Sequence, residues 1–234
     1  MKQAKLAILK IIILPTVILL SVSCKAATDT TQQKHWAYTP TVQNMRVSPT
    51  QAWNHVTSWL YQLTDYQDNQ LKQIAASNFD LVVIDLARDG SSDFFTAVEI
   101  SMVKETGKIV LAYFEIGAME NYRPEWSLLP DDLKLGPVSG WPDEQYIKYW
   151  DQRWWPMMQG RVDQAIAAGF DGVYLDMVIT YDEIPADAAG TNREDLAVKM
   201  VNLVKQISVY AKSLDPNFKI VPQNAPELSN WSGY

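Results

Sequence analysis

Three acidic residues each stand directly after an apolar run of strand-forming residues. They are Asp85 after residues 81–84, Glu115 after residues 109–114, and Asp176 after residues 173–175. In barrels of alternating strands and helices, the carboxyl ends of the strands form the active-site rim, so an acid there is a catalytic candidate. The pattern predicts a rim lined with carboxylates, with Asp176 as the catalytic candidate. The alternative for Asp176 is a capping role at the start of the next segment.

The elements that must position Asp176 are well marked in the sequence. Pro156 suits the first turn of a helix, and apolar residues then recur at helical spacing as far as Ile166. Gly169 suits the left-handed position that follows a helix end. The segment therefore predicts a helix, a tight turn and a buried strand that ends on the carboxylate.

The same alternation of strand and helix extends along the chain. Strands are predicted at residues 59–63, 79–85, 108–114, 146–150, 173–175 and 219–224. Helices are predicted at residues 68–77, from Ser91 or Ser92 to Gly107, at 156–168, and from the capping box Thr191–Glu194 to Leu214. Strands that alternate with helices indicate a parallel sheet.

Length limits how complete such a barrel is. An eight-fold barrel usually takes about 250 residues, and roughly 200 at the least. Only 182 residues run from Trp53 to Tyr234. We therefore expect an α/β fold of the (β/α)8 TIM-barrel type that is incomplete at its C-terminus, with about six of the eight units present.

Composition excludes several classes of function. The formal net charge is −7, and no stretch has the basic character of a nucleic-acid-binding protein. The two histidines, His35 and His55, are too few and too badly placed for a histidine metal cluster or a Ser-His-Asp site. No cofactor and no metal site are predicted.

The N-terminal region is predicted to lie outside the folded domain. Residues 1–23 carry three lysines, an apolar stretch at 11–20 and then small residues, which is the order of a secretory signal peptide. Cys24, the only cysteine, stands where bacterial lipoproteins carry the acylated residue, with plain secretion as the alternative. Residues 24–52 are polar and predict a tether to a domain at 53–234. We expect a secreted or cell-envelope lipoprotein that contacts the membrane only through an acyl chain.

Several motifs, taken together and in order, resemble one enzyme family. They are Tyr61-Gln62-Leu63; Val83-Ile84-Asp85 with Arg88-Asp89-Gly90; Ala112-Tyr113-Phe114 leading to Gly117 and to Glu120-Asn121-Tyr122-Arg123; Tyr149-Trp150-Asp151; residues 169–176; and Pro222-Gln223-Asn224. Over residues 53–226 the chain resembles the endo-α-1,4-polygalactosaminidases, glycoside hydrolase family 114. The resemblance implies a TIM barrel and hydrolysis of α-1,4-linked galactosamine polymers.

The resemblance also assigns a role to Asp176 and exposes three departures from the family pattern. Asp176 matches the family's strand-end catalytic Asp, the nucleophile, and glycosidases generally use two carboxylates. The family's acid/base Glu lies on a strand beyond Asn224 and has no counterpart in the chain, which Glu227 does not easily replace. Ile179 stands where the family usually has a second Asp, and Glu115 stands where it usually has a small residue.

Further residues are candidates for substrate binding, each with a structural alternative. Asp85 could bind a sugar amine or hydroxyl, or could hold the next turn. Glu120 and Arg123, three residues apart, favour an ion pair that fixes their loop over direct catalysis. Glu115 could add an acid to the cleft or lie solvated at the rim. Three other candidates are Tyr113 and Asn224 at strand ends, which could reach a sugar, and Trp150, which could stack on one or simply pack.

The sequence thus predicts a glycosidase that acts on a galactosamine-containing polysaccharide. Free amines make such a polymer cationic, so an acidic cleft would attract it. We expect the chain as written to hydrolyse it poorly or not at all, because the second carboxylate is missing. Two alternatives stand beside this prediction: a non-catalytic or vestigial sugar-binding barrel, and a glycosidase that acts on another exopolysaccharide.

Overall fold

The computed structural model describes residues 53–67 and 70–230. The predicted signal peptide, the tether and Cys24 lie outside these residues, so their assignments stay predictions. Within the described ranges, no helix is both long enough and apolar enough to cross a membrane.

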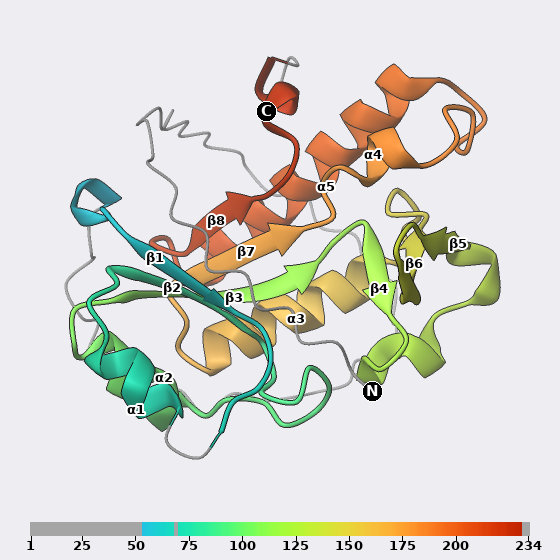
Figure 1. Cartoon of the computed structure of the whole chain (residues 1–234). Helices are drawn as coiled ribbons and strands as arrows, with labels where there is room; N and C mark the ends of the chain where they lie inside the picture. Colours follow the sequence, from blue (N-terminus) through green and yellow to red (C-terminus); the bar gives the residue numbers. More distant parts are fainter. Residues whose placement is uncertain (1–52, 68–69, 231–234) are drawn as a thin grey trace.

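A five-stranded parallel sheet forms the centre of the fold (Figure 1). Its strands are β1 (Trp59–Gln62), β2 (Leu81–Asp85), β3 (Ile109–Glu115), β7 (Gly172–Asp176) and β8 (Lys219–Pro222). Each strand pairs with the next one along the chain, in the order β1-β2-β3-β7-β8. Because the order never reverses, right-handed crossovers place the connecting helices on a single face, as in a TIM barrel.

Four helices connect the strands of this sheet. They are α1 (Gln70–Ala76), α2 (Ala97–Lys104), α3 (Trp155–Ala167) and α5 (Arg193–Leu214). Alternate strand residues such as Val82, Val110 and Val173 are buried in one large core with the apolar faces of the helices. The other alternate residues, including Val83 and Leu111, form a second cluster on the opposite face. This two-sided burial explains why the strands read as continuous apolar runs.

The short helical elements lie in the connections. They are α4 (Thr180–Glu183) and the 3₁₀ turns η1 (Trp53–His55), η2 (Pro124–Leu128), η3 (Asp131–Leu133) and η4 (Pro226–Asn230).

The sequence predicts six strands in the main sheet, whereas the structure has five there. The strand expected at 146–150 is instead β6 (Trp141–Ile147), the middle strand of a separate antiparallel sheet with β4 (Ala118–Glu120) and β5 (Lys134–Val138). This small sheet stands at the arrowhead end of β3 (Figure 1). β3 pairs directly with β7, because the chain between them pairs with itself and then returns through α3.

Two helices begin at residues other than the predicted ones. Thr96, rather than Ser91 or Ser92, caps α2: its hydroxyl accepts from the Glu99 N–H, and the Glu99 carboxylate accepts from the Thr96 N–H at 2.8 Å. Asn192, one residue after the predicted Thr191, caps α5 by accepting from the Asp195 N–H at 2.9 Å. In both places more than one polar residue could cap the helix. The three-dimensional path of the chain determines which of them does so.

Candidate active site

The three predicted acids lie at the carboxyl ends of neighbouring strands, as the sequence predicts. Asp85 ends β2, Glu115 ends β3 and Asp176 ends β7. Glu115 is in register with Asp176, and Asp85 is in register with Tyr113 of β3. All three acids are buried, with 2%, 1% and 9% of their surface exposed for Asp85, Glu115 and Asp176. Asp176 is therefore the most accessible of the three.

Within the part of the chain that the structure describes, three hydrogen-bond donors contact the side chain of Asp176. The Tyr113 hydroxyl donates to Oδ2 at 2.8 Å, while the Asn224 amide and the Met177 backbone N–H each donate to Oδ1 at 2.7 Å. Hydrogen bonds of this kind stabilise a charged carboxylate. Tyr113 of β3 and Asn224, two residues beyond the end of β8, thus contact the two oxygens of the β7 carboxylate.

The backbone around Asp176 is strained. Met177 and Asn224 have φ angles of 58° and 78°, in the left-handed region that is uncommon for residues other than glycine. Gly117 packs so closely against this turn that an added Cβ would lie 2.2 Å from the Met177 carbonyl oxygen. Each strained residue costs about 1–3 kcal/mol, and such residues concentrate at functional sites.

Tyr113 connects two of the carboxylates. Besides its bond to Asp176, its hydroxyl lies 3.2 Å from Glu115 Oε1. Burial, together with the charges of Glu115 and Asp176, raises the pKa of Tyr113 well above its usual value. The direction of this shift favours the protonated phenol.

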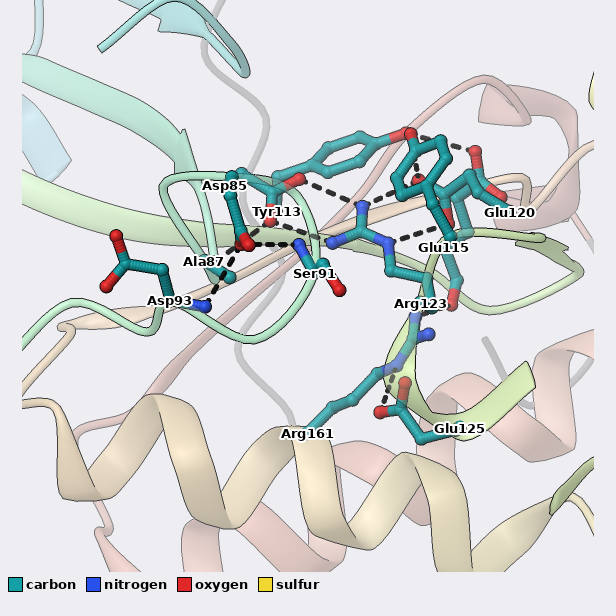
Figure 2. Close-up of polar contacts among 12 residues, drawn as sticks. Asp85, Ala87, Ser91, Asp93, Tyr113, Glu115, Glu120, Arg123, Glu125 and Arg161 are labelled. Carbon is teal, nitrogen blue, oxygen red and sulfur yellow. Dashed lines mark hydrogen bonds and ion pairs between the residues drawn. The ribbon is translucent and has the colours of Figure 1, made fainter. Parts of the chain in front are cut away.

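A second network surrounds Arg123, whose side chain is buried between two carboxylates (Figure 2). Its guanidinium binds Asp85 in a bidentate manner, at 2.8 and 2.9 Å. It also donates to both oxygens of Glu120, at 2.9 and 2.6 Å. Burial opposes the charge of Glu120, but the charge and hydrogen bonds of Arg123, helped by Arg161, lower its pKa to about 2.

The structure thus separates the predicted substrate-binding residues into groups. Glu120 and Arg123 form the predicted ion pair, which the structure extends to Asp85. Asp85 also accepts from the Ala87 N–H at 2.9 Å, so it holds the turn after β2. Tyr113 and Asn224 both contact Asp176. Their contact with a sugar, like that of Glu115, stays a prediction.

Trp150 lies apart from Asp176 and the residues that contact it. It lines a hollow on the helix side of the fold with Trp155 and Gln159 of α3 and Asn202 of α5. Its ring packs edge-on against Tyr149, with the ring centroids 4.9 Å apart. The packing alternative describes this contact, and a role in stacking on a sugar at the rim stays a prediction.

Several residues of the site were not identified from the sequence. Tyr61 and Tyr174 flank Tyr113 on the face of the sheet opposite the helices, with Tyr61 6.0 Å from Tyr113 by ring centroid. Arg161, only 3% exposed, donates to Glu125 at 3.2 Å and to the Glu115 carbonyl at 3.3 Å. Its place on the buried stripe of α3, between Met158 and Val162, is a signal that could have revealed it.

The geometry defines a class of protein. Over the described ranges 53–67 and 70–230, no group of His, Cys, Asp and Glu side chains could hold a metal ion. The rim carries the carboxylate of Asp176, the phenol of Tyr113 and the carboxylate of Glu115, near the carboxyl ends of parallel strands. Paired carboxyl groups on such a rim are the equipment of glycoside hydrolases.

The chain belongs to glycoside hydrolase family GH114, whose pattern it matches over residues 41–232. It is 33% identical over 186 residues to an uncharacterised protein of Deinococcus radiodurans, covering 76% of this chain and 57% of that one. It is 36% identical over 177 residues to an uncharacterised protein of Methanocaldococcus jannaschii, covering 73% and 49%. The chain thus spans about half the length of these curated relatives.

Solved structures show the same fold. The glycoside hydrolase domain of PelA from Pseudomonas aeruginosa superposes with a TM-score of 0.60 at 15% identity, covering 76% of this chain and 64% of that one. Aspergillus fumigatus Ega3, solved in complex with galactosamine, superposes with a TM-score of 0.55 at 22% identity, covering 73% and 61%. At these identities the likeness concerns the fold.

Proposed function

We propose that this protein is a glycoside hydrolase that cleaves an α-1,4-linked galactosamine polymer, with Asp176 as its catalytic carboxylate. The observation that carries the proposal is the convergence of Tyr113, Asn224 and the Met177 N–H on Asp176 at the rim of the sheet. A charged carboxylate fixed through both oxygens keeps one orientation toward a bound sugar. That orientation is what attack on an anomeric carbon, or stabilisation of its positive charge, requires.

The charge of the molecule supports the choice of substrate. The formal net charge is −7, and the carboxylates of Glu115 and Asp176 lie at the rim beside Asp85 and Glu120, which share the charge of Arg123. A partly deacetylated galactosamine polymer carries ammonium groups, which such a field would attract at low ionic strength. The galactosamine held by the structurally similar Ega3 is consistent with this substrate class.

The test is reducing-sugar release from partly deacetylated polygalactosamine. Asp176→Asn should lower turnover by about 10⁴-fold or more, because it removes the reacting carboxylate while keeping its shape. Asp187→Asn, the same exchange at an exposed position of the loop after α4, is the matched control and should leave turnover unchanged. Slow turnover by the wild-type chain is compatible with the proposal as long as Asp176→Asn abolishes it.

A sugar-binding protein without hydrolytic activity is the second candidate, and Ile179 favours it. This residue, where the family usually has a second Asp, is partly buried against the core. If wild type and Asp176→Asn bound the polymer equally and neither released sugar, the binding function would replace the hydrolytic one.

We also propose that residues 1–23 direct export and that Cys24 is acylated. The basic, apolar and small-residue order before a sole cysteine supports this. Growth with a labelled fatty acid should mark the wild-type protein and leave Cys24→Ser unmarked. Equal labelling of both proteins, or of neither, would contradict it.

A further inference from the structure

A hollow of about 890 Å³ lies on the helix side of the fold, between the first turns of α3 and the middle of α5. A shallower depression continues it along the same two helices. Together they form a surface that we call the helix groove, and the proposed function makes no use of it. The residues of this groove that carry the argument are Trp150, Trp155, Gln159, Lys199, Asn202 and Gln206.

The helix groove is bonded to the rim through the start of α3. Trp154, next to the groove residue Trp155, is fully buried, and its indole N–H donates to the Ile116 carbonyl at 2.9 Å. The Ile116 N–H donates in turn to the Asp176 carbonyl at 3.0 Å. One wall of the groove is therefore held in a fixed position relative to the rim, on the outer side of the fold.

Two indole rings give the groove flat apolar surface. Trp150 and Trp155 are both half-buried. Trp150 contacts Tyr149 edge-on at 4.9 Å and 89°, and Trp155 contacts Tyr210 edge-on at 5.7 Å and 84°. An edge-on neighbour fixes the orientation of a ring and covers at most one of its faces. Sugar rings expose a face of C–H groups that packs on an aromatic face of this kind.

Three amide side chains stand beside the two rings. Asn202 and Gln206 lie four residues apart and so share one side of α5, and Gln159 lines the groove from α3. Among residues 53–67 and 70–230, none of the three amides has a hydrogen-bond partner. Each amide can both donate and accept. The hydroxyl and acetamido groups of sugars also do both, so amides and aromatic rings together suit a sugar.

The charge of the groove selects among sugars. Lys199 and Lys205 line it and form no ion pair within the described ranges. Asp151 lines it too, but Asp151 and Asp132 both bind Arg153, at 2.8 and 2.7 Å. The two lysines leave the groove with a positive excess, in contrast to the acidic rim. A sugar that carries an ammonium group is therefore disfavoured here, whereas an uncharged sugar is not.

We propose that the helix groove is a second carbohydrate-binding site, which holds an uncharged stretch of polysaccharide such as a run of N-acetylated hexosamine units. The proposal goes beyond the proposed function, because binding in the groove needs neither Asp176 nor turnover. In a polymer with both free and acetylated amines, the units with ammonium groups suit the acidic rim. The acetylated units suit the groove.

Binding can be observed directly at the two indole rings. In the full chain labelled with ¹⁵N-tryptophan, a fully N-acetylated galactosamine hexasaccharide should shift the indole N–H resonances of Trp150 and Trp155. These resonances are identified by their absence from Trp150→Phe and Trp155→Phe. The same shifts should occur in Asp176→Asn. Resonances of Trp150 and Trp155 that both stay unchanged would overturn the proposal.

A variant of the amides tests the site without removing packed side chains. Asn202→Ala combined with Gln206→Ala changes two exposed positions of α5, where alanine favours the helix, so the fold should persist. Affinity for the acetylated hexasaccharide should fall about 2- to 10-fold for each hydrogen bond lost. Gln73→Ala, at an exposed position of α1, is the matched control and should bind as wild type does. Equal affinity of the double variant and the control would contradict the site.

The charge argument has its own test. A fully deacetylated hexasaccharide should bind in the groove more weakly than the acetylated one, and Lys199→Gln combined with Lys205→Gln should narrow that difference. High salt should narrow it as well. Equal or tighter binding of the deacetylated chain, or tighter binding of a galacturonate hexasaccharide, would refute an uncharged ligand. None of these results depends on whether Asp176→Asn abolishes sugar release, so the proposal and the proposed function can fail separately.

Discussion

Two buried carboxylate networks lie side by side at the rim and are built on different principles. In the first, Arg123 neutralises Asp85 and Glu120 through bidentate contacts of 2.6–2.9 Å. In the second, the side chain of Asp176 accepts, within the described ranges, from a phenol, an amide and a backbone N–H, which are neutral donors. A guanidinium compensates the charge of the carboxylates that it binds, whereas neutral donors orient a carboxylate without adding an opposite charge.

This contrast has a consequence for what each network does. Glu120 and Asp85 come from β4 and β2, so Arg123 joins the small antiparallel sheet to the main sheet. Asp176 ends β7 and Asn224 follows the end of β8 by two residues, and the backbone is strained at Met177 and Asn224. The first network is expected to determine stability and the second to determine activity.

The largest effect on stability should come from Arg123→Met. It leaves two buried carboxylates without their shared cation, and breaking a buried pair in this way costs about 3–5 kcal/mol. Chemical unfolding measures the loss. Arg153→Met is the matched control, because Arg153 also binds two carboxylates, Asp132 and Asp151, but with its side chain 49% exposed. If Arg123→Met lowered the free energy of unfolding no more than Arg153→Met does, the stabilising role of the Arg123 network would be contradicted.

The change in the free energy of unfolding with pH that arises from the Arg123 network should be slightly smaller than the effect of Arg123→Met. The pKa of Glu120 is lowered from 4.5 to about 2, so its contribution is present above about pH 4.5 and is lost as pH falls toward 2. A shift of this size corresponds to about 3 kcal/mol.

Urea unfolding of wild type and Glu120→Gln between these pH values tests this expectation. The variant should lack the part of the acid destabilisation that belongs to Glu120. Parallel curves for the two proteins would show that Arg123 does not hold Glu120 in its charged form.

The smallest of these effects should come from Asn224→Gly, which acts on activity. Glycine tolerates the φ of 78° at this position, so the substitution removes the amide donor without adding backbone strain. Loss of one hydrogen bond to a charged group, worth about 1.5–3 kcal/mol, should slow turnover roughly 10- to 100-fold.

Asn217→Gly, at an exposed turn beyond α5, is the matched control for Asn224→Gly. A fall in melting temperature with unchanged turnover would place Asn224 in the stabilising network and would contradict the division between the two.

Local sequence patterns determined a large part of this protein. The strand and helix segments, the acid at the end of each of three strands and the ion pair of Glu120 with Arg123 all follow from signals within a few residues of one another. Burial on both faces makes each strand an apolar run, and the run must stop where the chain reaches the polar rim. The family motifs in order along the chain were confirmed by the match over residues 41–232.

Tertiary structure alone decided which of these groups meet. Arg123 reaches Asp85 across 38 residues, Tyr113 reaches Asp176 across 63, and Asn224 reaches Asp176 across 48. The path of the segment between β3 and α3, which sends β6 into its own sheet, depends on pairing partners that short-range periodicity cannot specify. For the same reason, Tyr113 was recognised as a strand-end residue, but its position between two carboxylates became visible only once β3 and β7 were set in register.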